Sequence, residues 1–259
     1  MSGDPWRTLR RFTDARIALG RTGHALPTAE VLRFQFAHAL ARDAVVQPVD
    51  FAPVAAGLQA LGYGVEYLHS RTPDRATYLK RPDLGRLLDE PSRVRLDELR
   101  PGLWNPEVVV VVGDGLSAFA VERHAIPLLA AAGPGLTAAG LTVCPTVFLA
   151  RQARVALADE VGEALGARLA VILIGERPGL SSPDSLGIYL TFAPRRGRQN
   201  AERNCISNIR AAGLPYELAA CRLTWLAREA LRLGLTGVDL KDRSDGGLES
   251  PAPALSASS

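Results

Sequence analysis

The chain has 259 residues, 47% of them hydrophobic, which is enough for a buried core in one or two domains. Disordered, collagen-like and coiled-coil chains have other compositions and are excluded. Thirty basic and 27 acidic residues leave a net charge of only +3. Because nucleic-acid binders carry a clustered positive surface, we predict no nucleic-acid partner.

Arginine carries nearly all of the positive charge, since only Lys80 and Lys241 are lysines. The simplest explanation is a GC-rich genome. The alternative is that some arginines make bidentate contacts at an interface or with a ligand. The first 42 residues hold seven arginines and three acids, which fits either a solvated face or an arm that docks on an acidic partner.

Cysteine usage and hydropathy bear on the compartment. Cys144, Cys205 and Cys221 are odd in number and far apart, so we predict no disulfide framework and no zinc site, and we expect a reducing cytoplasm. Charged residues interrupt the first twenty positions, so we expect no secretory signal peptide. Residues 125–150 carry no charge but include six prolines and glycines, which predicts buried elements rather than a membrane span.

The first hundred residues have mostly helical patterns. One helix is predicted to begin at Thr28, with apolar residues recurring at helical spacing, and another covers residues 54–61 and ends at Gly62. The stretch 91–106 is rich in proline and charge and marks a boundary. We therefore predict a mostly helical N-terminal region over residues 1–106.

From residue 107 onward, strands and helices alternate. Residues 108–112 are an unbroken run of valines, typical of a strand buried on both faces. The remaining pattern predicts strands over 141–149, 169–174 and 186–192, helices over 117–132, from 157 to a stop at Gly166 and from Pro215, and loops over 175–185 and 193–214. This alternation predicts an α/β fold with a doubly wound parallel sheet over residues 107–243. Residues 244–259 are predicted to be a flexible tail.

The segment 113–118 fits the pattern G-x-G-x-x-A between a strand and a helix, as in dinucleotide-binding turns. Asp114 places a carboxylate where a pyrophosphate needs bare backbone amides, and no acidic residue follows the second strand to bind a ribose. Arg151 is placed to receive a 2′-phosphate, so an NADP-dependent reductase is the alternative function. A plain tight turn and a site for another ligand are the other two interpretations.

The chain lacks a local catalytic motif. Ser117 and His124 lie two helical turns apart, and the second glycine of a nucleophile elbow is missing. We therefore predict that Ser117 caps the following helix. The four histidines have no ligand spacing with one another or with cysteine, so we predict no catalytic residue and no metal site.

Three loops should meet at one edge of the predicted sheet. Residues 153–155, 175–179 and 204–208 follow the second, third and fourth strands, and ligands bind at the carboxyl ends of such strands. The loop over residues 175–185 is longer than the typical connection of about two to six residues. The residues predict a bound ligand or a partner subunit at this edge, and one surface can serve both.

Several longer motifs are specific to one family. They are Gly-Glu-Arg-Pro-Gly-Leu at 175–180, Ser-Leu at 185–186 and Glu-Arg-Asn-Cys-Ile-Ser-Asn-Ile at 202–209, supported by segments 81–86, 114–117 and 158–163. On these motifs the chain resembles the light (small) chain of ethanolamine ammonia-lyase over about residues 10–239.

The resemblance implies a subunit of a lyase that uses adenosylcobalamin to convert ethanolamine to acetaldehyde and ammonia by a radical mechanism. It implies that a large TIM-barrel subunit holds the substrate and most catalytic groups. Residues 1–106 are then expected to dock on that subunit, and residues 107–243 to form a Rossmann-like domain that covers part of the corrin. The family's cobalamin-contacting positions fall on Val155, Glu176 and Cys205.

The chemistry of the corrin assigns roles to these positions. Val155 is expected to make apolar contact, and Glu176 to accept a hydrogen bond from a corrin amide or to orient its loop, with an ion pair to an arginine as the alternative. Cys205 is expected to be a small contact rather than a nucleophile or a cobalt ligand. Arg177 and Arg203 are predicted to pair with acids of the neighbouring subunit. The Asp-x-His-x-x-Gly signature is absent from the sequence, so no histidine is expected to bind cobalt.

The resemblance also bears on location. Many family members have a longer N-terminal extension associated with packaging into a bacterial microcompartment, whereas this chain starts almost directly at Asp4, Pro5 and Trp6. We therefore expect a cytoplasmic protein, with microcompartment packaging through a partner as the alternative.

Overall fold

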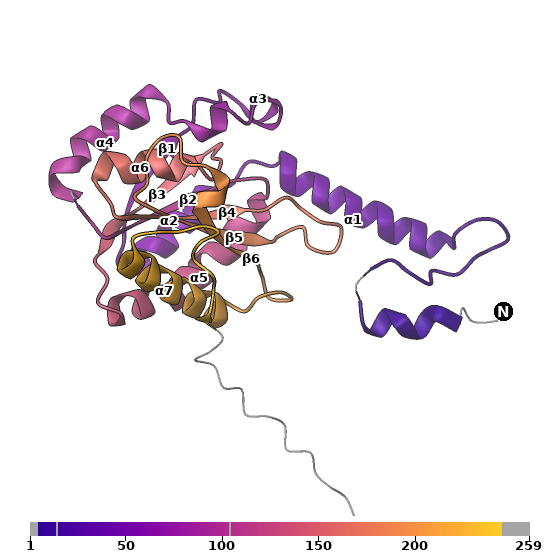
Figure 1. Cartoon of the computed structure of the whole chain (residues 1–259). Helices are drawn as coiled ribbons and strands as arrows, with labels where there is room; N and C mark the ends of the chain where they lie inside the picture. The colour runs from indigo at the N-terminus through magenta and orange to yellow at the C-terminus, as the bar shows by residue number, and fades with distance from the viewer. Residues whose placement is uncertain (1–4, 14, 104, 245–259) are drawn as a thin grey trace, which may run out of the picture.

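The computed structural model describes residues 5–13, 15–103 and 105–244 (Figure 1). The predicted flexible tail, residues 244–259, lies outside the described residues except for Ser244. The elements follow in the order η1 (Pro5–Arg11), α1 (Thr28–Val46), α2 (Phe51–Ala60), β1 (Gly64–His69), α3 (Arg75–Lys80), η2 (Leu84–Arg86), α4 (Glu90–Leu103), β2 (Val108–Gly113), α5 (Ala118–Ala138), β3 (Val143–Arg151), α6 (Leu157–Leu165), β4 (Leu169–Gly175), β5 (Leu186–Phe192), η3 (Asn200–Glu202), β6 (Arg203–Ile209) and α7 (Tyr216–Leu233).

The six strands form one mixed sheet in the order β1-β3-β2-β4-β5-β6. β1, β3, β2 and β4 are parallel, whereas β5 is antiparallel to β4 and β6 is antiparallel to β5. The predicted α/β class is confirmed, but the prediction of a parallel, doubly wound sheet of the Rossmann-like kind is wrong for β5 and β6. A parallel crossover usually contains a helix and about a dozen residues or more. The segment that joins β4 to β5 has neither, so the chain turns back.

Two strands lie where the sequence predicts none. β1 falls within the region predicted to be mostly helical, and it pairs with β3 in parallel. β6 falls within the segment 193–214 that is predicted to be a polar loop. Its buried residues are Arg203, Ile206 and Ile209, which do not alternate as in a regular half-buried strand.

The helices cover the two faces of the sheet (Figure 1). We call the side under α2, α5 and α7 the first face and the side under α4 and α6 the second face. Val108, Val110 and Val112 of β2 lie in the core of the first face, and Val109 and Val111 lie in the core of the second. The run of valines therefore forms a strand that is buried on both sides, as predicted.

The second face is covered only in part. There α4 and α6 pack on β1, β2, β3 and β4. Tyr189 of β5, which belongs to the second face, is half-buried, and Cys205 and Ser207 of the neighbouring β6 are exposed. We call the surface formed by Tyr189, Cys205 and Ser207 the open face.

An arm extends from this body. The helix α1 projects away from the sheet, and η1 lies beneath it in the view of Figure 1. We call residues 28–46 the arm. The helix begins at Thr28 as predicted, but Ala44 is the one buried residue described in it. Leu32, Phe34 and Phe36 are exposed, so the apolar residues of the arm do not belong to the core of the chain.

Several predicted helix ends are confirmed. The side chain of Ser117 accepts a hydrogen bond of 3.2 Å from the backbone N–H of Ala120 and caps α5. Gly166 ends α6 in the left-handed conformation, with φ of 68°, and α7 begins directly after Pro215. Among the described residues, no helix combines the length and the apolar character that crossing a bilayer requires.

Candidate functional site

A crevice of about 430 Å³ opens at the carboxyl edge of the parallel strands. It lies where the strand order reverses, because β3 and β4 flank β2 on opposite sides, and such switch points are the usual ligand sites of α/β sheets. The residues that line it come from α3, β5 and the ends of β2, β3 and β4: Tyr78, Gly115, Leu116, Arg154, Val155, Ile174, Gly175, Glu176, Arg177 and Tyr189. Two of the three predicted loops therefore meet in this crevice.

Two glycines allow the ends of β2 and β4 to approach each other closely. Gly115 has a φ of 59°, and a Cβ atom on it would lie 2.3 Å from the carbonyl oxygen of Gly175. A Cβ atom on Gly175 would lie 2.2 Å from the carbonyl oxygen of Ser117. Both distances are far below contact, so only glycine fits at either position. The motif at 113–118 is therefore a tight turn against β4.

Asp114 directly precedes Gly115, which lines the crevice. Its buried carboxylate accepts hydrogen bonds from the backbone N–H groups of Gln152, at 2.7 Å, and Ala153, at 2.8 Å, and it lies 3.7 Å from the guanidinium of Arg75. Burial raises the pKa of this carboxyl, although Arg75 and the backbone N–H groups act in the opposite direction. The carboxylate thus ties the end of β2 to the end of β3.

The NADP alternative is not supported by this geometry. Asp114 places a negative charge beside the turn that would have to hold a pyrophosphate. Arg151, the proposed receptor for a 2′-phosphate, donates to the carbonyl oxygen of Val49 at 3.3 Å and stacks on the ring of Phe51, with 5.2 Å between the guanidinium carbon and the ring centroid. Arg151 is therefore engaged in packing α2 against the sheet.

Tyr78 and Arg154 line one side of the crevice, and Arg75 also packs on the ring of Tyr78. This buried ring lies under the guanidinium groups of Arg154 and Arg75, at 4.1 and 4.6 Å from the ring centroid. Its hydroxyl donates to the carbonyl oxygen of Ala153 at 2.9 Å, and burial raises the pKa of the hydroxyl. No local pattern in the sequence indicates that α3 reaches the end of β3, so neither Tyr78 nor Arg75 is predicted as a site residue.

Glu176 joins three segments at the rim. Its carboxylate accepts hydrogen bonds from the hydroxyls of Ser185 and Ser207, each at 2.5 Å, and from the backbone N–H of Asn208 at 3.3 Å. In the part of the chain that the structure describes, no arginine forms an ion pair with it. These hydrogen bonds connect the loop after β4 to β6, and among the described residues the alternative, an ion pair with an arginine, is not present.

Cys205 does not line the crevice, but it lies next to it. It pairs with Tyr189 across β5 and β6, and Tyr189 is one wall of the crevice. Desolvation raises the pKa of the Cys205 thiol, and the nearby Glu176 adds to this, while a hydrogen bond with Tyr189 opposes it. A thiol of raised pKa is a poor nucleophile, which agrees with the prediction of a contact residue.

The two arginines predicted to face a partner have different positions. Arg177 is exposed at the crevice, and the described residues provide no ion pair for it. Arg203 is buried and bonded to the carboxylate of Asp159 on α6. The prediction that Arg203 pairs with acids of a neighbouring subunit is therefore wrong, because its acid partner belongs to its own chain.

Ser117 and His124 have separate structural roles. The hydroxyl of Ser117 donates to the carbonyl oxygen of Pro183 at 2.7 Å. The two ring nitrogens of His124 lie 2.8 Å from the hydroxyl of Tyr216 and 3.3 Å from the carboxylate of Asp184. Both residues thus anchor the loop that follows β4. Over the described ranges, no three His, Cys, Asp or Glu side chains are grouped so that they could hold a metal ion.

The fold is that of an α/β protein with a mixed sheet and a crevice at the carboxyl edge of its parallel strands. Residues 3–241 match the model of the family described as ethanolamine ammonia-lyase light chain (EutC). The chain belongs to this family, as the sequence motifs predict.

Relatives of similar length support this assignment. The chain is 55% identical over 252 residues to the ethanolamine ammonia-lyase small subunit of Pseudomonas paraeruginosa, covering 96% of this chain and 92% of the relative. It is 54% identical over 248 residues to that of Azotobacter vinelandii, and 55% identical over 245 residues to that of Ralstonia nicotianae, in each case covering 93% of this chain and 90% of the relative.

Proposed function

We propose that this chain is the small subunit of an adenosylcobalamin-dependent ethanolamine ammonia-lyase, a complex that converts ethanolamine to acetaldehyde and ammonia. The observation that carries the proposal is the position of Val155 and Glu176 in one crevice, with Cys205 on the adjoining open face. These are the three positions at which the family resemblance implies contact with the cofactor, and they come from three separate segments.

The residues present fit an edge of the corrin. Corrin is a broad, largely apolar ring fringed by amide arms, so a cover for it needs a flat apolar surface with hydrogen-bonding groups at its rim. Val155, Tyr189 and Cys205 offer the surface, and the carboxylate of Glu176 is an acceptor for an amide N–H. A crevice of about 430 Å³ suits amide arms and one edge of the ring, while the rest of the ring would lie over the open face.

When bound, adenosylcobalamin supplies a carbon-centred radical by homolysis of its cobalt–carbon bond. Val155 packs against the apolar edge of the ring. Glu176 orients an amide arm, and its own position is held by Ser185 and Ser207. Cys205 stays a neutral thiol because its pKa is raised, so it adds no charge beside the ring. Covering this edge keeps water away from the reactive species.

The proposal divides the work between two subunits. The relatives are named small subunits, which implies a large partner, and we assign the substrate site and the catalytic groups to that partner. The exposed Leu32, Phe34 and Phe36 of the arm form a surface suited to docking on it. The arm then serves assembly, whereas residues 107–243, together with Tyr78 of α3, cover the cofactor, in the cytoplasm or within a bacterial microcompartment.

The test is reconstitution with the large subunit. The chain alone should release no ammonia from ethanolamine, and the complex with adenosylcobalamin should. In the complex, Glu176→Ala and Cys205→Trp should weaken cobalamin affinity, measured by equilibrium titration, and the bulkier Cys205→Trp should have the larger effect. Cys221→Trp is the matched control, because Cys221 is also an exposed cysteine but lies on α7 over the first face. Activity of the isolated chain, or unchanged affinity in both variants, would contradict the proposal.

A further inference from the structure

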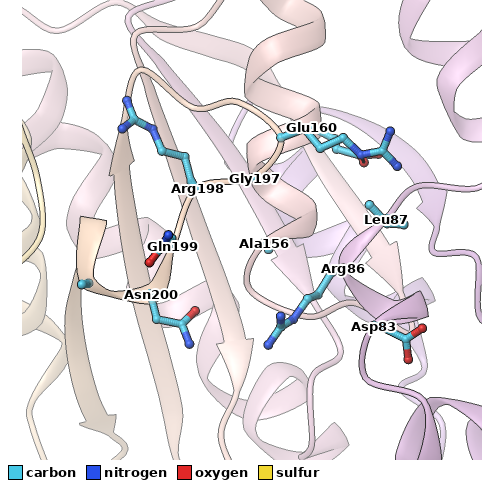
Figure 2. Close-up of a pocket in the computed structure, with 11 residues that line it drawn as sticks. Asp83, Arg86, Leu87, Ala156, Glu160, Gly197, Arg198, Gln199 and Asn200 are labelled. Atoms are coloured by element: carbon cyan, nitrogen blue, oxygen red, sulfur yellow. Dashed lines mark ion pairs between the residues drawn. The ribbon is translucent and has the colours of Figure 1, made fainter.

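A second cavity, of about 640 Å³, adjoins the crevice. It lies between η2, the start of α6 and the loop that leads from β5 to β6 (Figure 2). Consecutive residues at the start of α6 line the two hollows, Val155 the crevice and Ala156 the cavity. A ligand that lies over Val155 can therefore extend an arm into this second cavity.

Three arginines line the cavity, and two of them are already paired. Arg196 lies 3.2 Å from the carboxylate of Glu160, and Arg198 forms an ion pair with Glu202. Arg86 is exposed, and it has no ion pair among the residues that the structure describes. It is thus the arginine of this cavity whose charge is left for a ligand.

Among the neighbours of Arg86, Asn200 adds a hydrogen-bond donor, and the nearby carboxylate of Asp83 is already paired with another arginine. Asn200 uses its side-chain oxygen to accept from Arg203 at 3.3 Å, which leaves its amide N–H groups as donors. In Figure 2 the side chains of Arg86 and Asn200 point toward one another from opposite walls. The carboxylate of Asp83, which also lines the cavity, is bound by Arg81 at 2.7 Å. A guanidinium and an amide donor that converge on one space favour an oxyanion.

We propose that Arg86 and Asn200 bind a phosphate diester anion in this cavity. Resting on the proposed function, we assign this anion to the phosphodiester in the nucleotide arm of adenosylcobalamin, since the corrin ring with its neutral amides offers no other anionic oxygen. Arginine suits this role because its planar fork matches two phosphate oxygens. Free inorganic phosphate has the same chemistry, and the experiment separates the two sources.

The experiment compares two cofactors on the assembled complex. Adenosylcobinamide keeps the corrin ring but lacks the nucleotide arm and its phosphate. Arg86→Gln should weaken the affinity for adenosylcobalamin about tenfold, the factor that corresponds to 1.4 kcal/mol, and should leave the affinity for adenosylcobinamide unchanged. Arg195→Gln is the matched control, because Arg195 is an exposed arginine of the loop between β5 and β6 that does not line the cavity; it should alter neither affinity. An equal effect of Arg86→Gln on both cofactors, or no effect on either, would overturn the assignment.

Inorganic phosphate is the second probe. In the wild-type complex it should compete with adenosylcobalamin and not with adenosylcobinamide. Calorimetric binding of phosphate that is lost in Arg86→Gln, in a complex that binds neither cofactor, would contradict the proposed function and reassign the cavity to free phosphate. Absence of binding for phosphate and for both cofactors would overturn the phosphate site and the proposed function together.

Discussion

The second face of the sheet has two halves that differ in burial: helices cover the half over β1, β3, β2 and β4, and no helix of the described residues covers the half over β5 and β6. Over β1, β3, β2 and β4, helices α4 and α6 bury the side chains, and Val109 and Val111 are fully enclosed. Over β5 and β6, Tyr189 is half-buried and Cys205 is exposed. The difference arises from one connection. A crossover helix after β4 would have covered the next strand, whereas the helix-free loop between β4 and β5 turns the chain back, makes β5 antiparallel and leaves its second face open.

This comparison explains why the candidate site lies where it does. The first face is covered over β5 and β6 as well, since α5 and α7 pack on β5 and α7 packs on β6. The open face therefore belongs to strands that are well packed on their other side. In this part of the sheet, Tyr189 and Cys205 lie on strands whose other face is packed under α7, and their own side chains remain at least partly accessible.

The largest effect is expected at the boundary between the two halves, where Arg203 of β6 meets Asp159 of α6. Both side chains are buried, with 7% and 1% of their surface exposed. Arg203→Met would leave the carboxylate of Asp159 buried without its partner, so the free energy of unfolding should fall by about 3–5 kcal/mol. Urea unfolding followed by circular dichroism measures this change.

A double variant serves as the control for this pair. Adding Asp159→Leu to Arg203→Met removes the isolated charge and should restore much of the lost stability, because well-packed apolar pairs can replace buried ion pairs. A loss below about 1 kcal/mol in the single variant would mean that the pair is solvated, as exposed ion pairs are. The boundary between covered and open halves would then lie deeper in the sheet.

A smaller loss in the free energy of unfolding is expected for a change at Asp114, the residue before Gly115 of the crevice. Asp114→Asn keeps one acceptor oxygen but loses the second, which now accepts from the backbone of Gln152 or Ala153, so we expect a deficit of about 1–3 kcal/mol. Burial raises the pKa of Asp114 in the folded state, so the wild-type carboxyl contributes most stability below its unfolded pKa of about 3.9 and loses this contribution as the pH rises through the folded pKa. The deficit of Asp114→Asn should therefore be largest near about pH 4 and narrow toward neutral pH.

The prediction is tested by measuring the free energy of unfolding of the wild type and of Asp114→Asn across this pH range. A deficit that grows with pH would mean that Arg75 and the backbone N–H groups outweigh burial and lower the pKa of Asp114. Asp114 would then behave as a stabilised carboxylate rather than as a carboxyl whose charge is disfavoured by burial.

The smallest changes in stability are expected from removing one tyrosine hydroxyl. They compare a buried position with the open face directly, because the same atom is removed at each. Tyr78→Phe removes a buried hydroxyl and leaves the carbonyl oxygen of Ala153 without its donor, at a cost of about 1–2 kcal/mol. Tyr189→Phe removes a hydroxyl at the open face and should change stability by less than about 0.5 kcal/mol. Thermal unfolding of the two variants gives the comparison, and equal losses would refute the distinction between the halves.

Much of the fold follows from the sequence read locally. The valine run of β2, the strand β5, the cap at Ser117 and the stop at Gly166 are all properties of a few consecutive residues. Conversely, β6 was not predicted, because its segment is polar and it forms a strand only by pairing with β5. For the same reason β1 was hidden in a region that otherwise has helical patterns.

The candidate site divides in the same way. Long motifs in the sequence determined the family and pointed to Val155, Glu176 and Cys205, because residues next to one another in the chain preserve such motifs. Tertiary structure alone decided that Arg203 turns inward to Asp159, that Tyr78 lines the crevice, and that no described helix covers the second face of β5 and β6. These outcomes depend on contacts between residues far apart in the chain, and the packing of the whole sheet selects among the available partners.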